Sequence, residues 1–121
     1  MKLLVIDDSE LIRTRLVELL AATPGVERVQ TAHNLAEGLK QVAAAPPALL
    51  ILDLHLPDGH ALQALARFKR LAPGMALAVL TNDASRYNRD LSLALGADAF
   101  FDKSKEIGRV LHWVRDKAAQ T

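Results

Sequence analysis

The sequence predicts a single α/β domain in which helices cover both faces of a five-stranded parallel sheet. Two observations lead to this prediction. Short apolar runs alternate with longer amphipathic stretches from one end of the 121 residues to the other, as strands and helices do in a doubly wound sheet. The strand runs are also mostly apolar, which is typical of strands buried on both faces. A chain of this length fits one domain, assigned to residues 1–121.

Each element follows from its own pattern. The first helix places apolar side chains from Ile12 to Leu20 on one face. The second opens with Asn34 three residues before Glu37, the spacing of a capping box. The predicted strands are residues 2–6, 26–32, 48–52, 75–81 and 98–102, and the predicted helices are residues 9–22, 34–45, 60–72, 85–95 and 105–118.

The second half of the chain has clear helix stop signals. The third helix ends at Pro73-Gly74, and Gly96 closes the fourth. The last helix has an inner apolar stripe that runs from Ile107 to Val114. Residues 43–48, AAAPPA, are interpreted as a helix end and a turn.

Composition excludes several classes of protein. Fifteen lysines and arginines nearly balance fourteen acids, so a net charge of +1 gives no reason to expect nucleic acid or a membrane surface as a partner. The absence of cysteine excludes disulfides and thiolate metal sites. No apolar run is long enough to span a membrane or to form a signal-peptide core. We therefore expect a soluble, cytoplasmic protein.

The residues that follow the strands are the candidate functional residues, because ligands of doubly wound sheets bind at the carboxyl ends of strands. Asp7 and Asp8 follow the first strand, Asp53 the third, Thr81 the fourth and Lys103 the fifth. Three neighbouring carboxylates repel one another and raise one another's pKa. A hard cation relieves this repulsion, and oxygen-only ligands favour magnesium over zinc. The sequence thus predicts a Mg²⁺ site.

Such a site is equipped for phosphoryl transfer. Mg²⁺ keeps open positions for phosphate oxygens, Lys103 supplies a second positive charge and Thr81 a hydrogen-bond donor. Asp53, at the end of a rigid strand, is the natural nucleophile and would form an aspartyl phosphate. Taken singly, each residue has an ordinary explanation, such as a helix cap or a surface charge, so the prediction depends on their joint arrangement. His33, His60 and His112 share no metal-ligand spacing and are interpreted as ordinary residues.

The chain resembles response regulator receiver domains, the CheY-like modules of bacterial two-component signalling, which have a flavodoxin-like fold. Four motifs carry the resemblance in order along the whole length: VIDDS, LLILDLHLPDG, VLTN and GADAFFDKS. The resemblance implies that Asp53 accepts a phosphoryl group from a sensor histidine kinase or a histidine phosphotransfer protein. Because no output domain follows the last predicted helix, we expect a stand-alone receiver with an unidentified downstream target, although a fragment of a longer DNA-binding regulator would have the same sequence.

The resemblance also implies a role for each matching residue. Mg²⁺ would be bound directly by Asp8, Asp53 and the backbone carbonyl of His55, and through water by Asp7. Lys103 would pair with the phosphoryl oxygens, while Thr81 and Phe100 would form the switch. The partner surface, formed by the fourth helix, fifth strand and fifth helix, is also a candidate homodimer surface. It would include Tyr87, Arg89, Phe101, Arg109 and Trp113.

Three residues depart from the family pattern. Asn82 stands where a small residue is usual, Ser104 replaces the usual proline after the lysine, and Phe100 lacks the hydroxyl of a tyrosine. Without proline, a cis peptide costs about 3 kcal/mol. We therefore predict a trans Lys103–Ser104 bond, with the Ser104 hydroxyl capping the last helix.

Three alternatives remain at this point. A magnesium-dependent phosphatase with an aspartate nucleophile usually has a second acid two residues later, where this chain has His55. A flavodoxin-like cofactor binder needs amides and hydroxyls in its first loop, whereas DDSE offers negative charge. A receiver-like module that is never phosphorylated would not need the complete set of acids, hydroxyl and lysine. We therefore expect a phosphoacceptor rather than a turnover enzyme.

Overall fold

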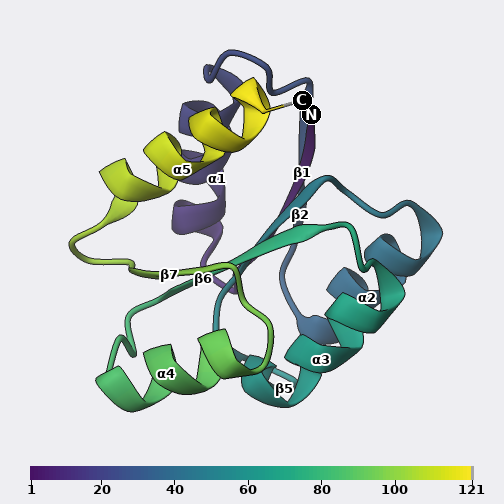
Figure 1. Cartoon of the computed structure of the whole chain (residues 1–121), viewed down its shortest axis with the longest axis vertical. Coiled ribbons are helices and arrows are strands. Elements are labelled where there is room, and N and C mark those ends of the chain that lie inside the picture. The colour runs from purple at the N-terminus through teal and green to yellow at the C-terminus, as the bar shows by residue number, and fades with distance from the viewer. Residues whose placement is uncertain (121) are drawn as a thin grey trace.

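Five parallel strands form the central sheet of the computed structural model, which describes residues 1–120 (Figure 1). The sheet order is β2-β1-β3-β6-β7, so the strand order reverses between β1 and β3. This arrangement confirms the predicted doubly wound fold. The strands are β1 (Lys2–Ile6), β2 (Arg28–Ala32), β3 (Leu49–Leu52), β6 (Ala76–Thr81) and β7 (Ala99–Asp102).

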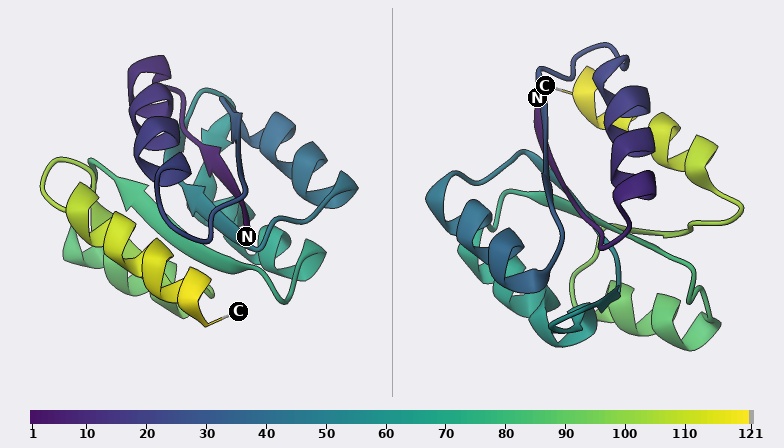
Figure 2. Two further views of the ribbon diagram at one scale, coloured as in Figure 1. Left: turned by 90° about the horizontal axis from the view of Figure 1, so that it is seen from above. Right: turned by 180° about the vertical axis from the view of Figure 1, so that it is seen from behind.

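Helices cover both faces of the sheet, with α1 and α5 on one side and α2, α3 and α4 on the other, as the right-hand view of Figure 2 shows. On one face α1 and α5 pack over a cluster that includes Leu3 and Val5, and on the other α2 and α3 pack over a cluster that includes Leu4 and Ile6. Because successive side chains of a strand point to opposite faces, double coverage explains the apolar strand runs. The helices are α1 (Glu10–Ala21), α2 (Leu35–Ala44), α3 (Ala61–Leu71), α4 (Arg86–Ala94) and α5 (Ile107–Ala119).

Helix α2 approaches β1 so closely that a side chain at Gly38 would have to displace part of Ile6. A methyl group on Gly38 would overlap the side chain of Ile6, whose Cδ1 atom occupies that space. The start of α2 is as predicted, since the Asn34 side chain accepts a hydrogen bond of 2.8 Å from the Glu37 amide. The close approach buries α2 against the strand that leads into Asp7.

A short antiparallel hairpin between β3 and α3 was not predicted. Strand β4 (His55–Leu56) pairs with β5 (Gly59–His60). Gly59 has a φ of 151°, a conformation that other residues rarely adopt. The carboxylate of Asp58 in the turn accepts hydrogen bonds from the first two amides of α2, at 2.8 and 2.9 Å. The hairpin is thereby attached to a helix from a different part of the chain.

The loop before α5 differs in part from the prediction. Within residues 1–120 no peptide bond is cis, so Lys103–Ser104 is trans as predicted. The predicted Ser104 cap is wrong, because the Ser104 hydroxyl donates to Asp102 Oδ1 at 2.7 Å. Helix α5 begins at Ile107, and its N-cap residue, Glu106, instead accepts a hydrogen bond from the Asp102 amide. None of the helices within this range is long and apolar enough to cross a membrane.

Candidate functional site

The carboxyl ends of four strands meet around a hollow of about 290 Å³. The backbone fixes this meeting point, since the Asp53 amide donates to the Ile6 carbonyl and the Lys103 amide to the Thr81 carbonyl, each at 2.9 Å. Strand pairing alone thus brings together side chains that lie far apart in the sequence. The hollow is lined by Asp8, Ser9, Ile12, Asp53, His55, Thr81, Asn82 and Lys103.

Lys103 joins two buried carboxylates in an acid–lysine cluster, defined here as Asp7, Asp8, Asp53 and Lys103. Its ammonium nitrogen lies 2.6 Å from Asp7 Oδ2 and 2.8 Å from Asp53 Oδ2. The exposed fractions of Asp7, Asp53 and Lys103 are 2, 6 and 8%. Charges buried to this extent are stable only when they are paired.

The charges in this cluster do not cancel. Burial raises the pKa of Asp7, although hydrogen bonds from Lys103 and from the Ser9 amide oppose the shift. Burial also disfavours the charged form of Lys103, but hydrogen bonds to Asp53 and Asp7 outweigh it and raise the lysine pKa. Lys103 is therefore charged at neutral pH, and one ammonium faces three carboxyl groups. A bound cation would therefore be electrostatically favourable in this cluster.

The acid–lysine cluster fits a hard divalent cation. Asp7, Asp8 and Asp53 each offer a carboxylate oxygen, and these atoms lie within 4.8 Å of one another. Both oxygens of Asp7 are already engaged, by the Ser9 amide and by Lys103. Asp8 is exposed, and Asp53 Oδ1 makes no hydrogen bond within residues 1–120. Asp8 and Asp53 are therefore the carboxylates with oxygens available to Mg²⁺.

Thr81 and Phe100, the predicted switch pair, lie on neighbouring strands. Thr81 ends β6 and is fully buried, and its hydroxyl accepts a hydrogen bond of 3.1 Å from the Asp83 amide. Phe100 pairs with Val79 on β6 and is buried in the core on the α2–α3 face, with 7% of its surface exposed. Movement of the pair stays a prediction.

The predicted partner surface contains four residues that reach solvent and one that does not. Tyr87 is 73% exposed on α4, Arg89 and Arg109 are exposed, and Trp113 is partly buried. Phe101 is buried under α5 and stacks edge-on against Trp113, with 6.1 Å between ring centroids. Phe101 therefore supports this surface from below, contrary to its predicted role as a contact residue.

A second polar group, the histidine–aspartate cluster of His55, His60 and Asp83, was missed. His55 Nε2 lies 2.6 Å from Asp83 Oδ2, and the two imidazole rings meet edge-on at 4.7 Å. His60, interpreted from the sequence as an ordinary residue, lies opposite His55 because the two residues pair in the hairpin. The signal was the turn sequence PDG between the two histidines, which favours a hairpin.

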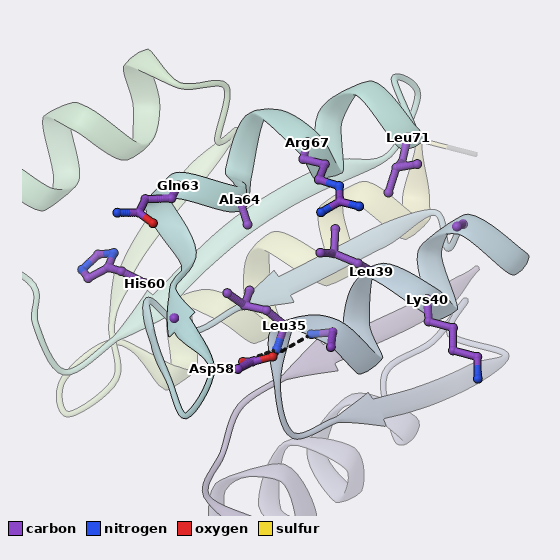
Figure 3. A pocket seen from close by; sticks show the side chains of 12 residues that line it. Leu35, Leu39, Lys40, Asp58, His60, Gln63, Ala64, Arg67 and Leu71 are labelled. Atoms are coloured by element: carbon purple, nitrogen blue, oxygen red, sulfur yellow. Dashed lines mark hydrogen bonds between the residues drawn. The ribbon is translucent and has the colours of Figure 1, made fainter.

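A larger hollow of about 660 Å³ lies on another face, between α2 and α3 (Figure 3). Its floor is apolar, formed by Leu35, Leu39 and Ala64 among others, and Lys40 and Arg67 stand at its rim. The one carboxylate that lines it, Asp58, already accepts hydrogen bonds from two amides of α2. It therefore lacks the converging free polar groups that the acid–lysine cluster provides.

Comparison with known families and curated proteins gives one consistent match. The model of the family described as "response regulator receiver domain" matches residues 3–115. The DNA-binding transcriptional activator DevR/DosR of Mycobacterium tuberculosis is 30% identical over 118 residues, which are 98% of this chain and 54% of that protein. A protein-glutamate methylesterase/protein-glutamine glutaminase of Desulfotalea psychrophila is 35% identical over 88% of this chain and 30% of its own length. The chain thus spans about half or less of these relatives.

Solved structures of response regulators also resemble this chain. A response regulator protein from Burkholderia pseudomallei, with a phosphorylated aspartic acid, a calcium ion and citrate, has a TM-score of 0.85 and 30% identity. The match covers 98% of this chain and 69% of that one. A CheY-like response regulator receiver domain protein from Methanospirillum hungatei has a TM-score of 0.88 and 28% identity, covering 98% and 94% of the two chains.

Proposed function

The chain belongs to the response regulator receiver domain family of two-component signalling, and on that premise we propose that Asp53 accepts a phosphoryl group from a phosphohistidine. The donor would be a sensor histidine kinase or a histidine phosphotransfer protein. One observation carries the proposal: the buried Asp53 carboxylate has one oxygen held by Lys103 at 2.8 Å, and it lines a hollow with Asp8 and Thr81.

The two oxygens of Asp53 would have different tasks. Lys103 fixes the carboxylate through Oδ2, and during transfer one Asp53 oxygen would attack phosphorus while the other stays on Mg²⁺. The new P–O bond forms as the P–N bond to the donor histidine breaks, and the imidazole keeps the electron pair and takes a proton from solvent. Mg²⁺ held by Asp8, Asp53 and the His55 carbonyl, with Asp7 acting through water, would supply positive charge for the phosphoryl oxygens.

Lys103 and Thr81 would then report the new group. On phosphorylation, the single negative charge of the Asp53 carboxylate is replaced by about −1.5 to −2 charges on a phosphoryl group that offers three strong acceptors at the end of β3. Lys103 can pair with it from the end of β7, and the Thr81 hydroxyl can donate to it from β6. A shift of Thr81 would change its contact with the Asp83 amide and the packing beside Phe100. The surface formed by α4, β7 and α5 would change as a result.

The first experiment tests the phosphoacceptor. The purified chain is incubated with acetyl phosphate and Mg²⁺, and intact mass spectrometry should detect one added phosphoryl group that is lost in hydroxylamine. Asp53→Asn should abolish the label, whereas Asp90→Asn, a change of an exposed aspartate on α4, should leave it intact. A label that survives Asp53→Asn would refute the proposal, and repeated turnover of a phosphate ester would identify a phosphatase instead.

A second experiment tests the switching surface. Hydrogen exchange is compared with and without beryllofluoride, a mimic of the phosphoryl group. Protection should change most in α4, β7 and the start of α5, around Tyr87, Arg89 and Arg109. A change in protection confined to α1 and α2 would contradict the proposed switching surface. It would not bear on the phosphoacceptor role of Asp53, which the first experiment tests.

A further inference from the structure

The histidine–aspartate cluster has the composition of a metal site, and it lies outside the acid–lysine cluster. His55 and His60 face each other across the β4–β5 hairpin, and Asp83 comes from the loop between β6 and α4. Each of the three offers one ligand atom, and these atoms lie within 4.8 Å of one another. Two imidazole nitrogens and one carboxylate oxygen suit a borderline transition metal better than Mg²⁺.

We propose that His55, His60 and Asp83 bind Zn²⁺, or a divalent cation of similar ligand preference, with a fourth position open to solvent. Three protein ligands and an open position are a known zinc arrangement. The cation would connect the hairpin to the β6–α4 loop. The site goes beyond the proposed phosphoacceptor function and does not depend on it.

The geometry requires only a small adjustment. Zinc bonds of about 2.0–2.2 Å place neighbouring ligand atoms about 3.3–3.5 Å apart. The 2.6 Å separation of His55 and Asp83 must widen, and the longest separation in the cluster must shrink. Both side chains are free to turn, since 56% of His55 and 46% of Asp83 is exposed.

The charge of the cluster also favours a cation. The Asp83 carboxylate is half exposed, and its Oδ2 lies 2.6 Å from the His55 imidazole. Among the described residues, no lysine or arginine forms an ion pair with Asp83. A metal would therefore not have to displace a positively charged side chain from Asp83.

Zinc would remove one weak hydrogen bond. His60 Nδ1 accepts a hydrogen bond of 3.3 Å from the Leu62 amide at the start of α3. Metal bound at Nδ1 takes that acceptor directly, and metal bound at Nε2 leaves the ring proton on Nδ1. In both cases the Leu62 amide loses its partner, which provides a local signature of binding.

The cation would also act on the neighbouring hollow. His55 lines the hollow beside Asp53, and the Asp83 amide donates to the Thr81 hydroxyl. Zinc on Asp83 would hold the loop that must move when Thr81 moves. Binding should therefore restrain the switch without touching the phosphoacceptor itself.

The experiment is a calorimetric titration with ZnCl₂ of the chain produced without a histidine tag, in excess Mg²⁺. We expect one saturable site, weakened about tenfold or more by His55→Ala, His60→Asn or Asp83→Asn. Asparagine at position 60 keeps a helix N-cap, and Asp83→Asn keeps the backbone bonds to Thr81 and Asn88. The matched controls His33→Ala and His112→Ala change exposed histidines outside the cluster and should bind as the wild type does.

Two further measurements make the result decisive. Imidazole ¹⁵N resonances of His55 and His60, and the Leu62 amide, should shift on zinc addition, whereas His33 and His112 should not. Binding should persist in Asp53→Asn, which damages the phosphoacceptor site only. Absence of saturable binding, equal loss in the two controls, or loss in Asp53→Asn alone would overturn the proposal, and the last result would place zinc in the acid–lysine cluster.

Discussion

The acid–lysine cluster and the histidine–aspartate cluster have equally short contacts but very different surroundings. Lys103 and Asp7 are 2.6 Å apart and almost fully buried, and His55 and Asp83 are 2.6 Å apart and about half exposed. The first pair stands at the ends of β1 and β7 in the central sheet, the second on a hairpin and a loop. Distance alone therefore says little about what a polar contact contributes.

Burial decides the difference. Removing one member of a buried ion pair leaves a charge that water cannot reach, which destabilises a protein by about 3–5 kcal/mol. An exposed pair is screened by solvent and ions and contributes little. The acid–lysine cluster should thus matter for stability as well as chemistry, whereas the histidine–aspartate cluster is free to rearrange around a ligand.

Lys103→Met should have the largest effect on folding. It leaves Asp7 and Asp53 buried without their cation, so the free energy of unfolding should fall by about 3 kcal/mol at neutral pH. Burial raises the pKa of Asp7 in the folded state, so the folded protein keeps the Asp7 proton to a higher pH than the unfolded chain does. Ionisation of Asp7 therefore lowers the free energy of unfolding as pH rises. Urea unfolding with a chelator present should show a smaller loss at mildly acidic pH. A loss that is equal at both pH values would contradict this account.

Asp8→Asn should have an intermediate effect, limited to metal binding. One carboxylate fewer should weaken Mg²⁺ binding by about tenfold or more, since ligand charge sets the affinity of such sites. Removing a like charge should leave the metal-free protein as stable as the wild type, or more so. Calorimetric Mg²⁺ titration and thermal unfolding measure the two quantities. Equal Mg²⁺ affinity in the two proteins would show that Asp8 is not a ligand.

Asp83→Asn should have the smallest effect on stability. The His55 hydrogen bond lowers the pKa of Asp83, so any stabilisation is present above the unfolded-state pKa and is lost as pH falls through the folded-state pKa. Because the pair is exposed, wild type and variant should unfold at nearly the same urea concentration at neutral pH, and identically in acid. A large difference at neutral pH would mean that this cluster is as structural as the buried one.

The sequence predicted the sheet and the acid–lysine cluster because both follow from simple geometry. Apolar runs mark doubly covered strands, and the ends of parallel strands meet at one edge, so Asp7, Asp53 and Lys103 had to converge. The β4–β5 hairpin could not be predicted from periodicity, since its strands have two residues each. With it the histidine–aspartate cluster was missed.

Two errors came from competition between neighbouring residues. Ser104 was predicted to cap the last helix, but its amide and its hydroxyl both donate hydrogen bonds to the Asp102 carboxylate instead. Phe101 was assigned to the surface, although alternation along β7 sends Phe100 and Phe101 to opposite faces and both faces are covered by helices. The motif GADAFFDKS identified Phe100 as the switch candidate. Side-chain alternation along β7 would have predicted that Phe101 is buried under α5.

The close approach of α2 to β1 has a consequence for how this sequence can vary. Gly38 and Ile6 share one volume, because a methyl group on the glycine would occupy the place of Ile6 Cδ1. Ile6→Val removes that atom, so Gly38→Ala should be tolerated far better in combination with Ile6→Val than alone. The two positions, thirty-two residues apart, should therefore covary among relatives, with a larger residue at one accompanied by a smaller residue at the other.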